Sequence, residues 1–193
     1  MSGSARERLL EAASDLFYHE GITTTGIDRV IARAQVAKAS LYNNFASKDD
    51  LVTAYLEVEL ARVEQVLAAL PRDTVGGATL ALFDDLAAAA QRPDFVGCPF
   101  LNAAVELGGD APARRVIDAF VARLAGFFLE DLAGDGARAT QLLVCYQGAM
   151  AAQRLTPGSS LVRAARDMAH KIVEAARART TSPTVTSAPT PVR

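Results

Sequence analysis

The segment from residue 21 to residue 55 contains two short amphipathic patterns and the start of a third. In the first pattern, apolar side chains recur at three- and four-residue steps and therefore share one helical face: Ile27, Val30, Ile31 and Ala34. After Gln35-Val36 the spacing restarts, with Leu41 and Phe45 as expected buried anchors. The second helix is barely two turns long, so it is stable only when docked on neighbouring elements. This segment therefore predicts two short helices joined by a tight turn.

Capping patterns indicate where the helices of this region begin and end. Thr25 to Asp28 has the Thr-x-x-acid pattern of a helix start, which predicts a helix from about Thr25, and Ser47 to Asp50 has a similar pattern. Upstream, Ser4 and Glu7 resemble a capping box, and Gly21 is placed to end the helix that follows. That helix, residues 4–19, carries an apolar stripe of Leu9, Leu10, Ala13, Leu16 and Phe17. We expect a compact three-helix unit.

The polar side chains of this unit point away from its predicted core. Arg29 and Arg33 lie opposite the apolar face of their helix. On the next helix, burial of Leu41 and Phe45 leaves four polar residues around the exposed side: Lys38, Ser40, Asn43 and Asn44. A short docked helix that presents polar groups in this way is typical of a helix-turn-helix DNA-binding unit. We therefore interpret residues 1–50 as a DNA-binding domain.

Residues 6–55 resemble the DNA-binding domain of the TetR family of bacterial transcriptional regulators. The residues that carry the resemblance are Ala12-Ala13, Leu16-Phe17, Gly21, Thr24-Thr25, Ile27, Ile31-Ala32, Ala34, Val36, Lys38, Ser40-Leu41-Tyr42, Phe45, Ser47-Lys48 and Leu51. Departures from the family pattern occur at Ala37 and Ala39, where small polar or glycine residues are common. Asn43-Asn44 replace a commoner basic or aromatic pair. These departures prevent transfer of an operator sequence by analogy.

The expected DNA contacts follow from side-chain chemistry. Lys48 at a helix start neutralises a phosphate, and Thr24 and Thr25 offer hydroxyls and backbone N–H groups to another. Tyr42 contacts phosphate or sugar through its hydroxyl. The candidates for base edges or the flanking backbone are Lys38, Ser40, Asn43 and Asn44, and Asn43 is the strongest because asparagine pairs two-pronged with adenine. The alternatives to DNA contact are that Asn43 and Asn44 are only solvent-exposed polar side chains, that Tyr42 belongs to the core, and that Thr25 only caps a helix.

The charge of the whole chain does not by itself attract nucleic acid. Its formal net charge is −2, so the electrostatic argument for DNA binding must be local. Between positions 29 and 48 there are four basic residues and no acidic ones: Arg29, Arg33, Lys38 and Lys48. We expect a modest basic edge, in which Arg29 and Arg33 belong more to a solvated face than to direct contacts.

The remainder of the chain is predicted to be all-α. Glycine and proline residues that break helices divide it into about six helices. These breaks are at Pro71, Gly76-Gly77, Pro93, Gly108-Gly109, Gly134 to Gly136 and Pro157-Gly158. No strand-like alternation survives between the breaks, and alanine is abundant. Residues 51–179 are therefore expected to form a larger helical domain. The final residues, 180–193, are rich in Thr, Ser and Pro, and we expect a disordered tail there.

Residues 137–155 and 160–178 carry apolar stripes in which small and large side chains alternate. In the TetR family the last two helices pair with their copies in a four-helix dimer interface, and the resemblance implies the same homodimer here. The alternative is that these stripes only close the core of the monomer. Dimerisation has a physical reason, because two recognition helices must enter major grooves roughly 34–36 Å apart.

The middle region is expected to hold a ligand pocket for a small-molecule effector. Its most distinctive segment is residues 97–102, in which Pro99 suits a first helical turn. Asn102 and Glu106, one turn apart on an otherwise apolar helix, are candidates to orient an apolar ligand, as are Cys98, Phe100, Phe127 and Tyr146. The alternatives are a solvent-facing Asn102 and Glu106 and ordinary core packing for the aromatic residues. Cys98 is either an oxidant sensor at a helix N-terminus or an inert buried thiol.

Several other functional classes are not expected. No run of about 18 apolar residues is present, and the N-terminus lacks the apolar block of a secretory signal, so we expect a cytoplasmic protein without membrane contact. Two isolated cysteines do not make a disulfide framework or a zinc site, so we expect neither a metal nor a cofactor. His19 and His170 lie in no recognisable catalytic motif, which argues against an enzyme.

The hypothesis from the sequence is a homodimeric transcriptional repressor that binds a double-stranded DNA operator and is released by an effector. By resemblance, the effector tilts the long helix that begins near Ser47 and changes the distance between the two DNA-binding units. Two alternatives remain open at this point. One is a helical ligand-binding protein that does not bind DNA, and the other is a thiol-based redox regulator that acts through Cys98.

Overall fold

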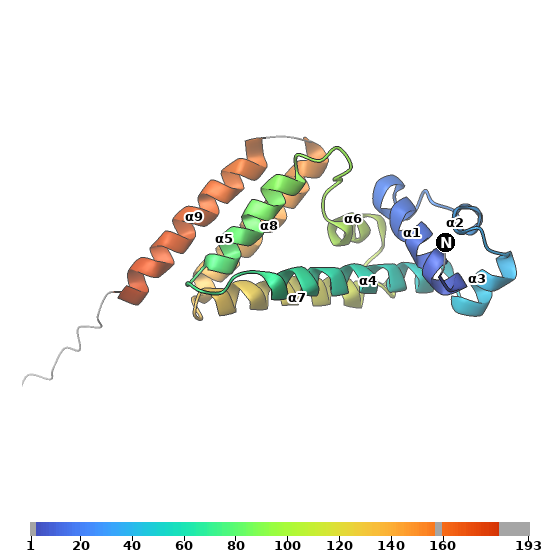
Figure 1. Cartoon of the computed structure of the whole chain (residues 1–193), viewed down its shortest axis with the longest axis horizontal. Helices are drawn as coiled ribbons and strands as arrows, with labels where there is room; N and C mark the ends of the chain where they lie inside the picture. Colours follow the sequence, from blue (N-terminus) through green and yellow to red (C-terminus); the bar gives the residue numbers. More distant parts are fainter. Residues whose placement is uncertain (1–2, 157–159, 182–193) are drawn as a thin grey trace, which may run out of the picture.

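The computed structural model describes residues 3–156 and 160–181, and every regular element within these ranges is an α-helix (Figure 1). The first three helices form one end of the molecule, and the long fourth helix runs from them into the rest of the fold (Figure 1). The bounds are α1 Ala5–Glu20, α2 Ile27–Ala34, α3 Lys38–Asn44, α4 Lys48–Ala69, α5 Gly77–Ala89, α6 Pro99–Glu106, α7 Arg114–Asp131, α8 Gly136–Leu155 and α9 Ser160–Thr181. The prediction of an all-α fold is confirmed.

Helix α1 begins and ends as the sequence predicts. The Ser4 hydroxyl accepts a hydrogen bond from the Glu7 amide, and the Glu7 carboxylate accepts one from the Ser4 amide, which completes the capping box. Gly21 ends the helix at a φ of +97°, a conformation that side chains with a Cβ rarely adopt. The predicted apolar stripe is buried. Local signals were therefore sufficient to define this helix.

The N-cap of helix α2 lies one residue later than its capping pattern predicts. The N-cap is Gly26, and no side chain caps the helix. Thr25 is fully buried instead, and its hydroxyl donates to the Gly21 carbonyl at 2.7 Å. A helix does begin near Thr25, at Ile27, but the predicted capping by Thr25 was wrong because this hydroxyl satisfies the end of α1 rather than the start of α2. The helix ends at Gln35, whose left-handed conformation makes the tight turn before α3.

Helix α3 is only seven residues long and is held by its apolar anchors. Leu41 and Phe45 are buried, as predicted, and the Arg6 guanidinium lies 5.3 Å from the centroid of the Phe45 ring. The Ser47 hydroxyl then accepts a hydrogen bond from the Asp50 amide at 3.1 Å, which confirms the predicted capping of α4. Helix α3 therefore packs against α1 and α2.

In the larger domain, α7 packs against α4, α6 and α8, and α9 packs against α5 and α8 (Figure 1). The N-terminus of α5 is satisfied by Asp131 at the end of α7, whose carboxylate accepts from the Thr79 amide at 2.7 Å. Gly76 precedes α5 at a φ of +72°, and a Cβ there would lie 2.3 Å from a Val173 methyl group on α9. Glycine is thus required by both conformation and space, and it lets α5 approach α9 closely.

The six helices α4 to α9 correspond to the predicted division of the second region. Helices α8 and α9 coincide with the stripes at residues 137–155 and 160–178. Helix α9 extends through Thr181, two residues into the expected tail, while residues 182–193 lie outside the described residues. Within the described ranges, no helix combines the length and apolar character needed to cross a bilayer.

Candidate DNA-binding face and ligand cavity

The exposed side of α3 carries the residues that the sequence singled out for base contacts. Tyr42 is 54% exposed, which decides against its alternative as a core residue. Lys38 and Asn43 are also exposed, and the Asn43 amide makes no hydrogen bond to another described residue. Ser40 is half-buried. The Tyr42 ring and the Asn43 amide thus lie uncovered on one short helix, available to a duplex.

Other predicted contacts are placed differently. The Thr25 hydroxyl is buried, so the prediction that it reaches a phosphate was wrong. Thr24 is exposed, and its hydroxyl donates to the Glu20 and Gly21 carbonyls. The Asn44 amide donates to the Ser40 carbonyl at 2.7 Å, which uses it within the helix. Lys48 is the first residue of α4 and is half-buried.

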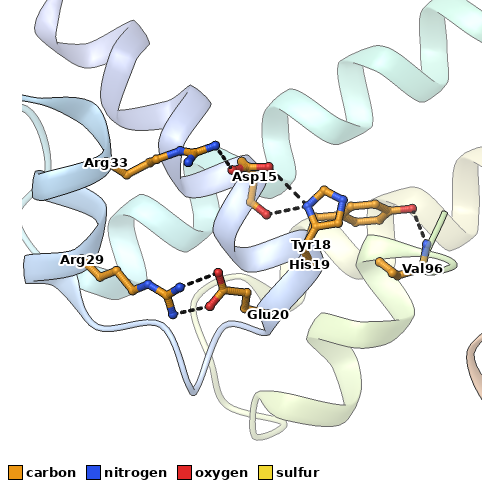
Figure 2. A network of polar contacts seen from close by, with 7 residues as sticks. All are labelled: Asp15, Tyr18, His19, Glu20, Arg29, Arg33 and Val96. Carbon is orange, nitrogen blue, oxygen red and sulfur yellow. Dashed lines mark hydrogen bonds and ion pairs between the residues drawn. The ribbon is translucent and has the colours of Figure 1, made fainter. Parts of the chain in front are cut away.

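Most of the basic edge is paired within the domain. Arg29 donates to Glu20 at 2.7 Å, and Arg33 donates to Asp15 at the same distance, so both link α2 to α1 (Figure 2). Lys38 on α3 donates to Asp28 on α2 at 3.0 Å. The sequence did not indicate this pairing, because the acidic partners lie outside residues 29–48, the range in which only basic residues occur. In the folded domain these partners are close in space. The positive field toward DNA is therefore weaker than the spacing indicated.

The Lys38–Asp28 pair leads to a first prediction. Asp28→Asn is expected to raise DNA affinity about twofold to fivefold and to steepen the salt dependence, because Lys38 becomes free for a phosphate. The pair is exposed, so breaking it costs little. Fluorescence anisotropy with labelled operator over a salt series measures both effects. Asp49→Asn is the control, since it removes an equal charge at the start of α4, and an equal gain there would attribute the effect to net charge alone.

A cavity of about 440 Å³ lies where the larger domain meets α1. Its lining comes from six helices and from the loop before α6. A chamber of about 190 Å³ shares part of this lining. Three of the predicted ligand-binding residues line both spaces: Cys98, Phe100 and Tyr146. The cavity thus has an apolar interior and an end that faces the DNA-binding domain.

The other three predicted ligand-binding residues lie away from this cavity. Asn102 and Glu106 border a separate surface hollow beside the end of α8. Glu106 accepts hydrogen bonds from the Thr23 amide at 2.8 Å and the Thr23 hydroxyl at 3.0 Å, so its carboxylate is bound to the DNA-binding domain. Phe127 is fully buried among aromatic neighbours and lies under Arg72. These three residues therefore do not line the cavity, because helical spacing does not indicate which neighbour covers a face.

Cys98 does not have the properties of an oxidant sensor. Its side chain is 4% exposed, and burial raises the pKa of the thiol to about 11. The thiolate is the reactive form, so a neutral buried thiol reacts slowly with oxidants. This finding contradicts the alternative of a redox regulator that acts through Cys98. Across the described residues, no group of three or more His, Cys, Asp or Glu side chains is arranged to hold a metal ion.

The charged end of the cavity was missed in the sequence. It contains Asp15 and His19 of α1 together with Glu59 and Arg62 of α4. A signal existed for Glu59, because Tyr55, Glu59 and Val63 follow one another at four-residue steps on the inner face of α4. An acidic residue within an apolar stripe indicates either a buried ion pair or a ligand contact. Burial raises the pKa of the Glu59 carboxyl, which Arg62 partly offsets.

Hydrogen bonds connect the cavity wall to the DNA-binding domain. The Tyr18 hydroxyl on α1 accepts from the Val96 amide and donates to the Gly97 carbonyl, both at 3.2 Å (Figure 2 shows the first). Glu106 binds Thr23 at the other end of α6. The segment that carries Cys98 and Phe100 is therefore hydrogen-bonded to the DNA-binding domain at both ends.

Comparison with known proteins agrees with this architecture. Residues 9–55 match the model of the bacterial regulatory proteins of the tetR family. The HTH-type transcriptional activator FasR of Mycolicibacterium smegmatis is 31% identical over 125 residues, which covers 58% of this chain and 57% of that protein. The chain thus matches little more than half the length of this curated relative.

Two crystal structures cover most of the chain. A TetR-family transcriptional regulator from Streptomyces coelicolor has a TM-score of 0.79 and 31% identity over 89% of each chain. A putative TetR transcriptional regulator from Streptomyces avermitilis has the same score and identity over 91% of this chain and 99% of its own. The exposed helix α3, the helical second domain and these likenesses together assign the chain to the TetR family of DNA-binding bacterial transcriptional regulators.

Proposed function

We propose that the protein is a homodimeric repressor that leaves its operator when a small molecule enters the cavity. The observation that carries this proposal is the uncovered side of α3, where Tyr42 and Asn43 lie on a helix anchored by Leu41 and Phe45. A helix of this kind fits the major groove. We assign DNA binding to residues 1–50 and ligand binding and dimerisation to residues 51–179. Because its partner is genomic DNA, we also propose a cytoplasmic location.

The homodimer is supported by a second apolar face on α8 and α9. Leu142 and Tyr146 of α8 are buried within the subunit, whereas Val144 is 68% exposed. On α9, Leu161 and Met168 are each more than half exposed. The apolar stripes of α8 and α9 therefore include side chains that the core of one subunit does not bury. A two-fold axis beside this face would bury the face against the same face of a second subunit. The same axis would place the two α3 helices at the spacing of successive major grooves.

Effector release is supported by the position of the cavity. Its walls include α1, which belongs to the DNA-binding domain, and α4, which starts directly after that domain. A ligand that fits one arrangement of these helices better than another shifts the population toward that arrangement. The extent of release is then limited by the difference in affinity between the two states.

The proposal is tested by footprinting the DNA that flanks the gene of this protein. We expect a protected palindrome and loss of protection with a cavity ligand found by thermal-shift screening. Absence of any protected site would instead favour the ligand-binding protein without DNA binding. The relative FasR is named an activator. A promoter–reporter fusion in cells with and without this protein therefore decides whether it represses or activates transcription. Higher reporter output with the protein would make it an activator.

Lys48 gives a second prediction, on the phosphate contact. Lys48→Ala is expected to weaken binding to all DNA sequences alike and to reduce the salt slope by about 0.9 per subunit, because one phosphate contact is lost. Gel-shift titrations with operator and with random DNA at several salt concentrations measure this change. An unchanged slope, or a loss confined to the operator, would mean that Lys48 does not contact phosphate.

A further inference from the structure

We propose that the effector is a cationic amphiphile, with an amine or ammonium head beside Glu59 and an apolar body between Phe100 and Tyr146. This inference rests on the proposed function, since it names the ligand class of the same cavity. The inference follows from an unequal distribution of charge and burial along the cavity, which is lined by aromatic rings in its interior and by charged side chains at one end.

The interior of the cavity suits an apolar group. The rings of Phe100 and Phe120 are stacked with centroids 4.1 Å apart and an interplanar angle of 8°. Both rings line the main cavity and its side chamber, together with Met150 and Tyr146. Cys98, also on this wall, is a neutral thiol at physiological pH. An alkyl chain or flat hydrophobic group therefore gains from burial here, and an ionised group does not.

The charged end of the cavity favours a positive head group. The Glu59 side chain is only 17% exposed, whereas Arg62, its ion-pair partner, is 59% exposed. Arg62 contacts Oε1 of Glu59 at 2.5 Å, and within the described chain Oε2 accepts no hydrogen bond. Solvent screens an exposed charge more than a half-buried one. The field inside the cavity is therefore dominated by the Glu59 carboxylate.

The other charged side chains at this end of the cavity do not make the electrostatic field inside it positive. Asp15 adds a second carboxylate, shared with Arg33 and with His19 at 3.3 Å. Arg92 is 63% exposed, lies 3.7 Å from Asp94 and stands over the Phe95 ring. Arg62 and Arg92 are thus mostly exposed to solvent. The side chains of Glu59 and Asp15 are both more buried than these two arginines. A cationic donor can satisfy the open oxygen of Glu59, while an anion would meet Glu59 and Asp15.

The experiment compares three probes that share one chain and differ in the head: decylammonium, decanoate and decanol. Isothermal titration of the full-length protein, below micelle formation, is expected to show the cation binding about tenfold tighter than decanoate, as for a charge-assisted contact. Glu59→Gln should abolish this preference and leave decanol binding unchanged, which also verifies folding. Glu57→Gln is the matched control, because Glu57 lies two residues away and pairs with Arg115 at 3.0 Å outside the cavity.

The outcomes separate this inference from the proposed function. Binding of decanol without preference for the cation, or a preference that survives Glu59→Gln, overturns the cationic class and leaves the cavity as an effector site. Failure of all three probes to bind contradicts the cavity as an apolar ligand site, and with it the proposed effector release.

Discussion

Val144→Glu is expected to make the protein monomeric and to lower operator affinity about a hundredfold or more. Val144 is exposed on the face of α8 that we assign to the dimer, and a two-fold axis would bring its two copies onto one interface. A buried carboxylate there is costly without a partner. Loss of the second half-site then removes an effective-concentration gain of about 10²–10⁴. Analytical ultracentrifugation and gel-shift titration measure the two effects.

Tyr42→Glu is the matched control for this prediction. It places the same charge at another exposed, largely apolar side chain, on the DNA-binding face instead of the α8–α9 face. This variant should remain a dimer and lose DNA binding. If Val144→Glu sediments as a dimer, the interface lies elsewhere. If it is monomeric and retains full operator affinity, the two half-sites are not bound jointly.

Asn43→Ala is expected to relax base preference at two symmetric positions of the operator. A two-pronged amide–adenine pair contributes about 1–3 kcal/mol of discrimination, and the dimer makes it twice. The affinity for the best site should therefore fall about thirtyfold to about twenty-thousandfold, while affinity for random DNA stays nearly constant. Selection of binding sites from a randomised DNA pool, for the original protein and the variant, measures the preference position by position.

Asn44→Ala provides the control, because the Asn44 amide is already bonded to the Ser40 carbonyl. It should alter base preference little, although the two residues are adjacent and chemically identical. Equal loss of preference in both variants would indicate a general disturbance of α3. An unchanged preference with Asn43→Ala would assign the discrimination to another residue of the helix.

The DNA-binding unit was largely predictable because its signals are local. The Ser4–Glu7 capping box, the αL-compatible Gly21 and the apolar spacing around Leu41 each act within one or two helical turns. Thr25 is the exception. Its Thr-x-x-acid pattern was a valid start signal, but the hydroxyl found a carbonyl four residues upstream. Two competing local hydrogen bonds cannot be ranked from sequence alone.

The cavity was predictable only in part. Of the residues that the sequence assigned to a ligand site, Phe100 and Tyr146 line it, whereas Phe127 and Glu106 do not. Each of these four residues lies on an apolar or mixed helical face. Periodicity identifies the buried side of a helix, but a cavity and a filled core both have apolar walls. Which one forms depends on how six helices and a loop fit together.

The chain by itself determined the helical class, the ends of most helices and the exposed character of α3, because capping and periodicity operate between neighbours along the backbone. Only the tertiary structure decided which charges meet. It paired Lys38 with Asp28 and Arg33 with Asp15, bound Glu106 to Thr23, and enclosed Glu59 beside an apolar cavity. These contacts join helices whose separation in sequence has no relation to their distance in space, so electrostatics and cavities follow from packing.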